Sequence, residues 1–136
     1  MVKKHVSKTI GTSRSKSFIS VAESFEEAAD LAFEFEYYNA AGVLYIHSAI
    51  AYADAVTIKL GSLKSSGDNH YQVINLLESI VPASRIDKKA ITNFKSLIDH
   101  KNLISYTGDI YHKKDVDKIR RHFDKFRIWS YLILGL

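Results

Sequence analysis

A lysine interrupts the apolar face of the helix that the sequence predicts near residue 100. The apolar residues of this segment recur at intervals that place them on one helical face. They are Ile91, Phe94, Leu97, Ile98 and Ile104. Lys101 falls on the same face, where it must extend along its stem to solvent or find an anionic partner. Asn102 and Tyr106 follow, so the segment KNLISY (101–106) is the strongest candidate for a functional site.

Further polar residues fall in or beside a segment that should be buried. Residues 39–60 are apolar around nearly the whole helical circumference, which predicts a central helix. His47 and Asp54 nevertheless share one face of it, two turns apart. His70 closes the polar loop 62–70 that follows. Together with Lys101 and its neighbours, these side chains supply the groups that line polar clefts.

Two interpretations of these six residues remain open. They can converge between the second and fourth helices to bind a ligand. They can instead satisfy one another, with Asp54 paired to Lys101 or His70. His47 would then bond a carbonyl, and the ring of Tyr106 would pack on the core. Several ionisable groups on buried faces are costly, which favours a function for the group as a whole.

Other kinds of site are not predicted. The chain has no cysteine, which excludes disulfides, thiolate metal sites and a cysteine nucleophile. Its six histidines form no helical His-x-x-x-His pair, so no metal site is expected. No glycine-rich phosphate loop and no Gly-x-Ser-x-Gly motif occur. We therefore expect neither a metal nor a cofactor.

The chain also carries no uncharged apolar run of the roughly 18 residues that a membrane span needs. Its first residues, MVKKHVSKTIGTSRSK, lack the apolar core of a signal peptide. These features, with the absence of cysteine, predict a cytoplasmic protein that does not enter a membrane.

Charge is distributed unevenly along the chain. Residues 1–17 carry five Lys and Arg and no acid, and residues 18–60 carry seven acids and one lysine. Residues 85–136 carry twelve Lys and Arg against six acids. Such a distribution suits a basic groove for an anion or nucleic acid, and it suits self-complementary dimerisation equally well. Solvated faces that segregate by chance remain the third explanation.

Hydrophobic periodicity predicts an all-α protein, a five-helix antiparallel (up-and-down) bundle. Gly61 should end the second helix and Pro82 the third. No segment has the two-residue period of a strand. Residues 1–16 should form a flexible basic arm, and residues 17–136 the bundle. The expected helices are Ser17–Tyr38, Asn39–Leu60, His70–Val81, Asp87–Tyr106 and Lys114–Leu134.

Over residues 18–134 the chain resembles HEPN domains (higher eukaryotes and prokaryotes nucleotide-binding), as a divergent member. YYNAAGVLYIHSAIAYADA (37–55) is similar to the second-helix block of that family, and SSGDNH (65–70) to the loop before its third helix. KNLISYTG (101–108) is similar to the Arg-Asn-x-x-x-His or Arg-x-x-x-x-Tyr signature late in the fourth helix. The resemblance implies an antiparallel helical bundle.

The resemblance also implies partners and chemistry. Many HEPN proteins are homodimers whose signature residues line a shared cleft. Many are metal-independent RNases, often toxins paired with a nucleotidyltransferase-like antitoxin, and others only bind. This chain has Lys101 in place of the family's Arg and Tyr106 in place of its His. Lysine holds phosphate only as a point charge, and a phenol with a pKa near 10 is a poor base.

We therefore expect a HEPN-like module that binds RNA or a nucleotide, with weak or no catalysis. The ligand would lie against Lys101, Asn102 and Tyr106, with Asp54 positioning Lys101. His47 and His70 are the other expected site members. Catalytic candidates, if any, are Lys101, Tyr106 and His47. The alternatives are an RNase toxin and a non-catalytic interaction or dimerisation module.

Overall fold

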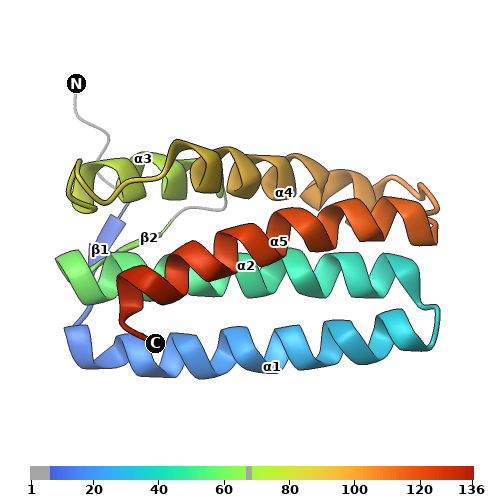
Figure 1. Ribbon diagram of the computed structural model, residues 1–136, viewed down its shortest axis with the longest axis horizontal. Helices are drawn as coiled ribbons and strands as arrows, with labels where there is room; N and C mark the ends of the chain where they lie inside the picture. The colour runs from blue at the N-terminus through green and yellow to red at the C-terminus, as the bar shows by residue number, and fades with distance from the viewer. Residues whose placement is uncertain (1–6, 67–68) are drawn as a thin grey trace.

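A computed structural model of the chain describes residues 7–66 and 69–136. Within these residues lie five α-helices, as expected for an all-α bundle (Figure 1). Helices α1 and α2 run in opposite directions, and so do α4 and α5 (Figure 1). The helices are α1 Ser15–Glu34, α2 Tyr38–Gly61, α3 Tyr71–Ile80, α4 Lys88–Tyr106 and α5 Lys113–Leu134.

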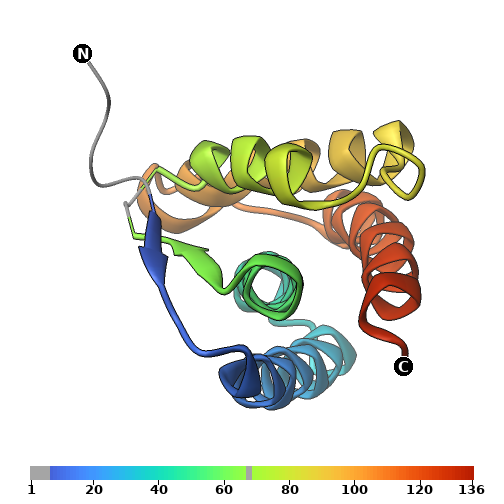
Figure 2. The ribbon, with the colours of Figure 1, turned by 90° about the vertical axis from the view of Figure 1, so that its left-hand side faces the viewer.

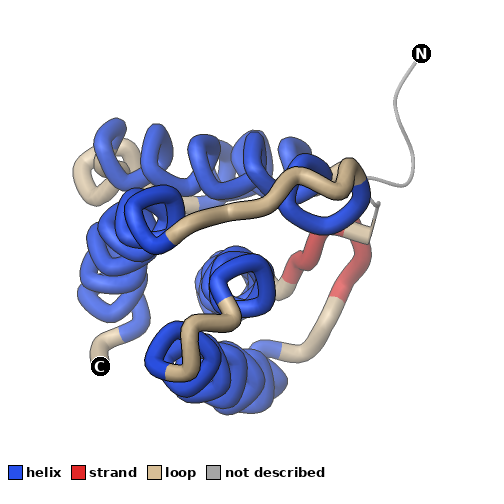
Figure 3. Tube along the Cα trace, turned by 90° about the vertical axis from the view of Figure 1, so that its right-hand side faces the viewer, coloured by secondary structure: helices blue, strands red, loops and turns tan. Residues whose placement is uncertain are grey.

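Helix α2 occupies the centre of the bundle. Viewed along its axis, it has α1 on one side, α3 and α4 on the opposite side, and α5 beside it (Figures 2 and 3). Its length and hydropathy would suffice to cross a membrane, but 83% of its most apolar window is buried inside the protein. That is the pattern of the core helix of a soluble protein, which the absence of a polar face predicted.

Small residues on α2 let its neighbours approach closely. A side chain added at Gly42 would place its Cβ 2.3 Å from Ile104 Cδ1 of α4. Ile119 of α5 would also be near, at 3.3 Å. A glycine here therefore fixes the distance between α2 and the end of α4 that carries the candidate segment.

Helix boundaries follow local capping chemistry. The Asp87 side chain accepts hydrogen bonds from Lys89 N and Ala90 N and so begins α4. His112 and Asp115 form a capping box at the start of α5. Helix α1 differs most from the prediction, because it ends at Glu34 and the next helix begins at Tyr38. Between them Glu36 takes a left-handed conformation with φ of 64°.

Two short strands were not predicted. Strand β1, Ser7–Thr9, pairs antiparallel with β2, Leu63–Ser65. A 3-10 helix, η1 Thr12–Arg14, then leads into α1. Three-residue strands are too short to show a two-residue period, so sequence reasoning missed them. The structured chain therefore begins before the predicted boundary at residue 17, and residues 1–6 of the predicted arm lie outside the described residues.

Acids of α1, tyrosines of α2 and arginines of α5 form a polar seam that was also not predicted. Glu26 accepts hydrogen bonds from Arg127 and, at 3.0 Å, from Tyr52. Tyr52 lies 3.3 Å from the hydroxyl of Tyr131. A second set lies one heptad away on α2 and α5. Its members are Asp30, Tyr45 and Arg120.

The left-handed residue after α2 is Ser62, with φ of 54°, and the predicted stop, Gly61, is the last helical residue. A left-handed backbone conformation costs a residue with a side chain about 1 kcal/mol of conformational free energy, and glycine does not have this cost. Ser62→Gly is therefore expected to raise the free energy of unfolding by about 1 kcal/mol, measured by urea denaturation. Ser20→Gly, at an exposed position within α1, is the control and should cost about 0.5 kcal/mol. The prediction would be contradicted if Ser62→Gly lowered the free energy of unfolding as much as Ser20→Gly does.

Candidate functional site

A pocket of about 420 Å³ lies where the start of α3 meets the second half of α4. It contains three of the six predicted site residues, which are His70, Lys101 and Asn102. Loop and helix thus bring together residues that are 31 positions apart in the chain. The residues lining the pocket are Asn69, His70, Tyr71, Ile98, Asp99, Lys101 and Asn102.

The acid of this pocket is already engaged. Asp99 accepts a hydrogen bond from the Tyr71 hydroxyl at 2.6 Å and forms an ion pair with Lys95 at 3.4 Å. The hydrogen bond from Tyr71, and then the contact with Lys95, lower the pKa of Asp99. Within residues 7–66 and 69–136, no carboxylate lies within ion-pair distance of Lys101. The Lys101 ammonium is therefore the cation best placed to attract an anion into the pocket.

The start of α3 contributes little to anion binding. The Asn69 side chain accepts from Tyr71 N at 3.0 Å and so satisfies the first N–H group of the helix. Backbone N–H groups of Gln72 and Val73 already donate to loop carbonyls. An anion would be held by side chains here and not by the helix terminus.

His47 lies close to Lys101 but does not line the pocket. Burial, and then the positive charge of Lys101, lower the pKa of His47 below its ordinary value. Its ring contacts Phe25 of α1, with ring centroids 5.8 Å apart. The packing of α4 on α2 therefore brings His47 and Lys101 together, as the sequence suggested, while the imidazole is kept neutral near pH 7.

Asp54 does not position Lys101, and that prediction was wrong. Its carboxylate pairs with Lys64 at 3.7 Å, because strand β2 returns along α2 and brings Lys64 back over it. Burial raises the pKa of Asp54 to about 6, although Lys64 opposes the shift. Its Oδ1 atom has no hydrogen-bond partner among the described residues. Asp54 therefore belongs to a separate buried pair beside the β1–β2 ribbon.

Tyr106 also lies apart from the pocket, with 79% of its surface exposed at the end of α4. The end of α4 is held by Asn39, whose amide donates to Ile104 O at 3.2 Å and to Asp109 O at 2.8 Å. Asn39 Oδ1 accepts from Tyr111 N at 2.8 Å. Asn39 thus ties the end of α4, within the segment KNLISYTG (101–108), to the loop that leads into α5.

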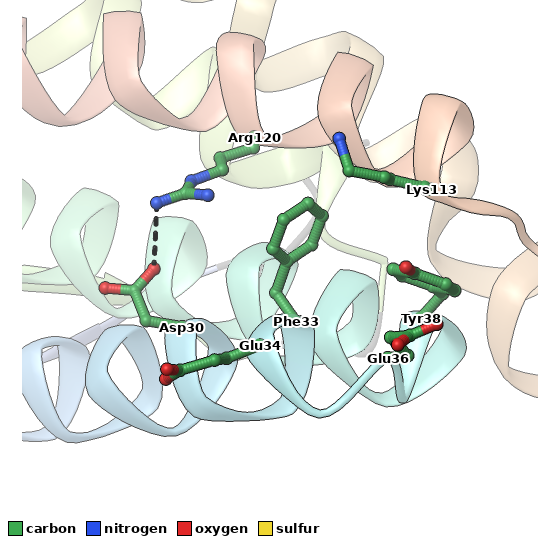
Figure 4. A pocket seen from close by; sticks show the side chains of 7 residues that line it. All are labelled: Asp30, Phe33, Glu34, Glu36, Tyr38, Lys113 and Arg120. Carbon is green, nitrogen blue, oxygen red and sulfur yellow. Dashed lines mark ion pairs between the residues drawn. The ribbon is translucent and has the colours of Figure 1, made fainter.

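A larger pocket of about 710 Å³ lies between α1 and α5 (Figure 4). Its cations are already compensated, since Arg120 pairs with Asp30 at 3.6 Å and Lys113 with Asp117 at 3.2 Å. Both cations also lie over the ring of Phe33. Three carboxylates and two cations line this pocket, so it is less suited to an anion than the smaller one. Its lining residues are Asp30, Phe33, Glu34, Glu36, Tyr38, Lys113 and Arg120.

Sequence reasoning missed two residues of the smaller pocket, Tyr71 and Asp99. The spacing of Lys95 and Asp99 is a visible i,i+4 pair that marks an exposed face of α4. Nothing in the sequence places Tyr71 against that face, because its position depends on how the loop 62–70 folds.

Comparisons with known proteins do not identify the chain. No protein-family model matches it, and a search among curated proteins finds no match.

Proposed function

We propose that the chain is a module that binds the phosphate of RNA or of a nucleotide in the pocket between α3 and α4. The observation that carries this proposal is the Lys101 ammonium, which lines a pocket whose own carboxylate is engaged by Tyr71 and Lys95. Asn102 and His70 supply further polar groups beside it. The resemblance to HEPN domains supports the same class of ligand.

Each lining residue has a role in this proposal. Lys101 attracts a phosphate as a point charge, and the amide of Asn102 orients it. Tyr71 lines the pocket, is 42% exposed and has Lys95 over its ring at 5.8 Å, so a base would stack on the face opposite Lys95. Tyr106 has no role in binding the ligand in this proposal, and Asp54 pairs with Lys64 outside the pocket.

Lys101→Ala is expected to weaken binding of a labelled single-stranded RNA about tenfold or more at low salt, because it removes a charge-assisted contact. Binding is measured by fluorescence anisotropy in EDTA. Lys16→Ala is the charge-matched control, because Lys16 is exposed on α1, on the opposite side of α2 from α4. Equal affinities of the Lys101 and Lys16 variants would exclude the pocket as the binding site.

An RNase that cleaves by attack of the ribose 2′-OH is the second candidate function. The observation favouring it is His70, an imidazole that lines the same pocket as Lys101. An imidazole is a competent general base near neutral pH, whereas Tyr106 is not. Cleavage in EDTA on a denaturing gel, lost in His70→Gln, would establish the activity. Binding without cleavage would leave the module non-catalytic.

The remaining expectations belong to the same proposal. The HEPN resemblance supports a homodimer and a nucleotidyltransferase-like antitoxin as a partner, and the lack of cysteine and of a signal-peptide core supports a cytoplasmic location. The competing proposal is a non-catalytic interaction or dimerisation module. In that case Lys101→Ala would change the oligomeric state, measured as molar mass by light scattering, and the wild-type protein would bind no RNA.

A further inference from the structure

A third cavity, a groove of about 490 Å³, lies between the first turns of α4 and the middle of α5. Three lysines and two neutral polar residues line it, and none of its lining residues is acidic. Lys88 and Lys89 come from α4 and Lys125 from α5, so cations flank the groove on both sides. Thr92 and Asn93 are the neutral members.

The surroundings of His122 show that positive charge dominates this region. His122 bonds the side chain of Asn93 at 2.8 Å. Burial, and then the charges of His100, Lys125 and Arg121, lower its pKa. Lys125, which lines the groove, and Arg121 are thus the two permanent cations that act on His122.

The two acids next to the lining lysines in sequence have other partners. Asp87 precedes the groove, but its carboxylate accepts from Lys89 N and Ala90 N as the cap of α4. Asp124 neighbours Lys125 in sequence and lies 3.9 Å from Arg127, which also binds Glu26. Neither acid lines the groove, whose three charged lining residues are all lysines, while Glu78 lines the neighbouring pocket that shares Lys88 and Thr92.

The exposed cations of α5 form a row whose spacing fits a polymer. Lys118, Arg121 and Lys125 are exposed at intervals of three and four residues, about one turn or ~5 Å of helix axis each. A chain with one charge on every repeating unit can contact several such cations at once, whereas a small anion contacts one. Counterion release would make such binding strongly salt-dependent.

One exposed stripe of α4 connects the groove to the pocket of Lys101. Its members follow one another at intervals of four and three residues, and all are exposed. They are Lys88, Thr92, Lys95, Asp99 and Asn102. Lys88 and Thr92 line the groove, while Asp99 and Asn102 line the pocket.

Large apolar residues are absent from the lining of the groove. The exposed apolar residues of α5, Ile128 and Leu132, begin only beyond Lys125. A membrane surface or a protein partner would ordinarily bury apolar anchors between the cations. A lining of cations and neutral polar groups is instead typical of contacts to a nucleic-acid backbone.

We propose that the α4/α5 groove binds the sugar-phosphate backbone of a single-stranded RNA that runs along the exposed stripe of α4 into the Lys101 pocket. The proposal rests on the proposed function for the class of ligand. Lys89 and Lys101 are twelve residues apart, about 18 Å along the helix. At about 3.4 Å per nucleotide of a stacked strand, six or more nucleotides are needed to occupy both places.

The test compares a labelled 12-nucleotide RNA with labelled AMP by fluorescence anisotropy over a series of salt concentrations. In Lys89→Gln/Lys125→Gln, affinity for the 12-mer is expected to fall tenfold or more at low salt. The slope of log K against log salt should become shallower by about 1.4, or 0.7 per lost contact. AMP should bind this variant as it binds wild type. Arg14→Gln/Lys16→Gln, which removes two exposed charges at the start of α1, is the matched control.

The outcomes separate the two proposals. If the Lys89/Lys125 variant binds the 12-mer with unchanged affinity and salt slope, the groove does not bind RNA. The proposal that the pocket binds the ligand would then still stand. If the Lys89/Lys125 variant loses 12-mer binding while Lys101→Ala binds both ligands normally, the proposed binding at the pocket is refuted. The proposed RNA binding at the groove is then retained. If the Lys89/Lys125 variant bound RNA normally but lost binding to vesicles of anionic phospholipid, the groove would be a membrane surface. Circular dichroism of each variant confirms that it is folded.

Discussion

Arg127→Ala is expected to lower the free energy of unfolding by about 2–3 kcal/mol. Arg127 binds Glu26 across the seam between α5 and α1, and its side chain is only 28% exposed against 16% for Glu26. Its guanidinium also lies over the rings of Phe123 and Tyr131. Removing it leaves the Glu26 carboxylate nearly buried with only the hydroxyl of Tyr52 to satisfy it, and an unpaired buried charge is costly.

The chain contains its own control for this prediction. Arg120 pairs with Asp30 one heptad earlier on the same helix, but the two side chains are 41% and 50% exposed. Solvent screens such a pair, so Arg120→Ala should cost less than about 1 kcal/mol. Both variants are measured by urea denaturation, with the fluorescence of Trp129, the single tryptophan, as the probe. Equal costs would show that burial of the Arg127 pair does not determine its strength.

Asp54→Asn is expected to stabilise the protein by an amount that depends on pH. The pKa of Asp54 is about 6 in the folded protein, because burial opposes its charge, against 3.8 ordinarily. Between these values the folded protein binds a proton that the unfolded chain does not bind. Wild-type stability should therefore fall as pH rises from about 3 to about 7, by about 3 kcal/mol for this group alone. Asparagine does not titrate, so the variant lacks this loss.

The measurement is the difference in free energy of unfolding between Asp54→Asn and wild type, taken from pH 4 to pH 8. The difference should grow by about 2.5 kcal/mol over this range, most of it below about pH 6.5, and then stay constant. The lowered pKa values of His47 and His122 have the opposite effect, since each loses stability as pH falls, but both residues are present in the two proteins and their effects cancel. A difference that does not vary with pH would show that Asp54 titrates outside this range.

The sequence by itself determined the fold class and the identity of the central helix. Periodicity located five helices with boundaries within about two residues, apart from the end of α1, because apolar spacing and capping residues act locally. The segment 39–60 was recognised as buried because it has no polar face. The chain also marked Lys101 and Asn102 as unusual, since a lysine on an apolar stripe is visible without coordinates.

Only the tertiary structure decided which of the unusual residues meet. Asp54 pairs with Lys64 because two three-residue strands turn the chain back over α2, and no period reveals strands that short. Tyr106 points to solvent, since Asn39 and Gly42 fix how α4 ends against α2. Arg127 and Glu26 are 101 residues apart and meet only through the packing of α1 and α5. Contacts of this kind depend on the relative placement of whole elements, which local sequence patterns do not encode.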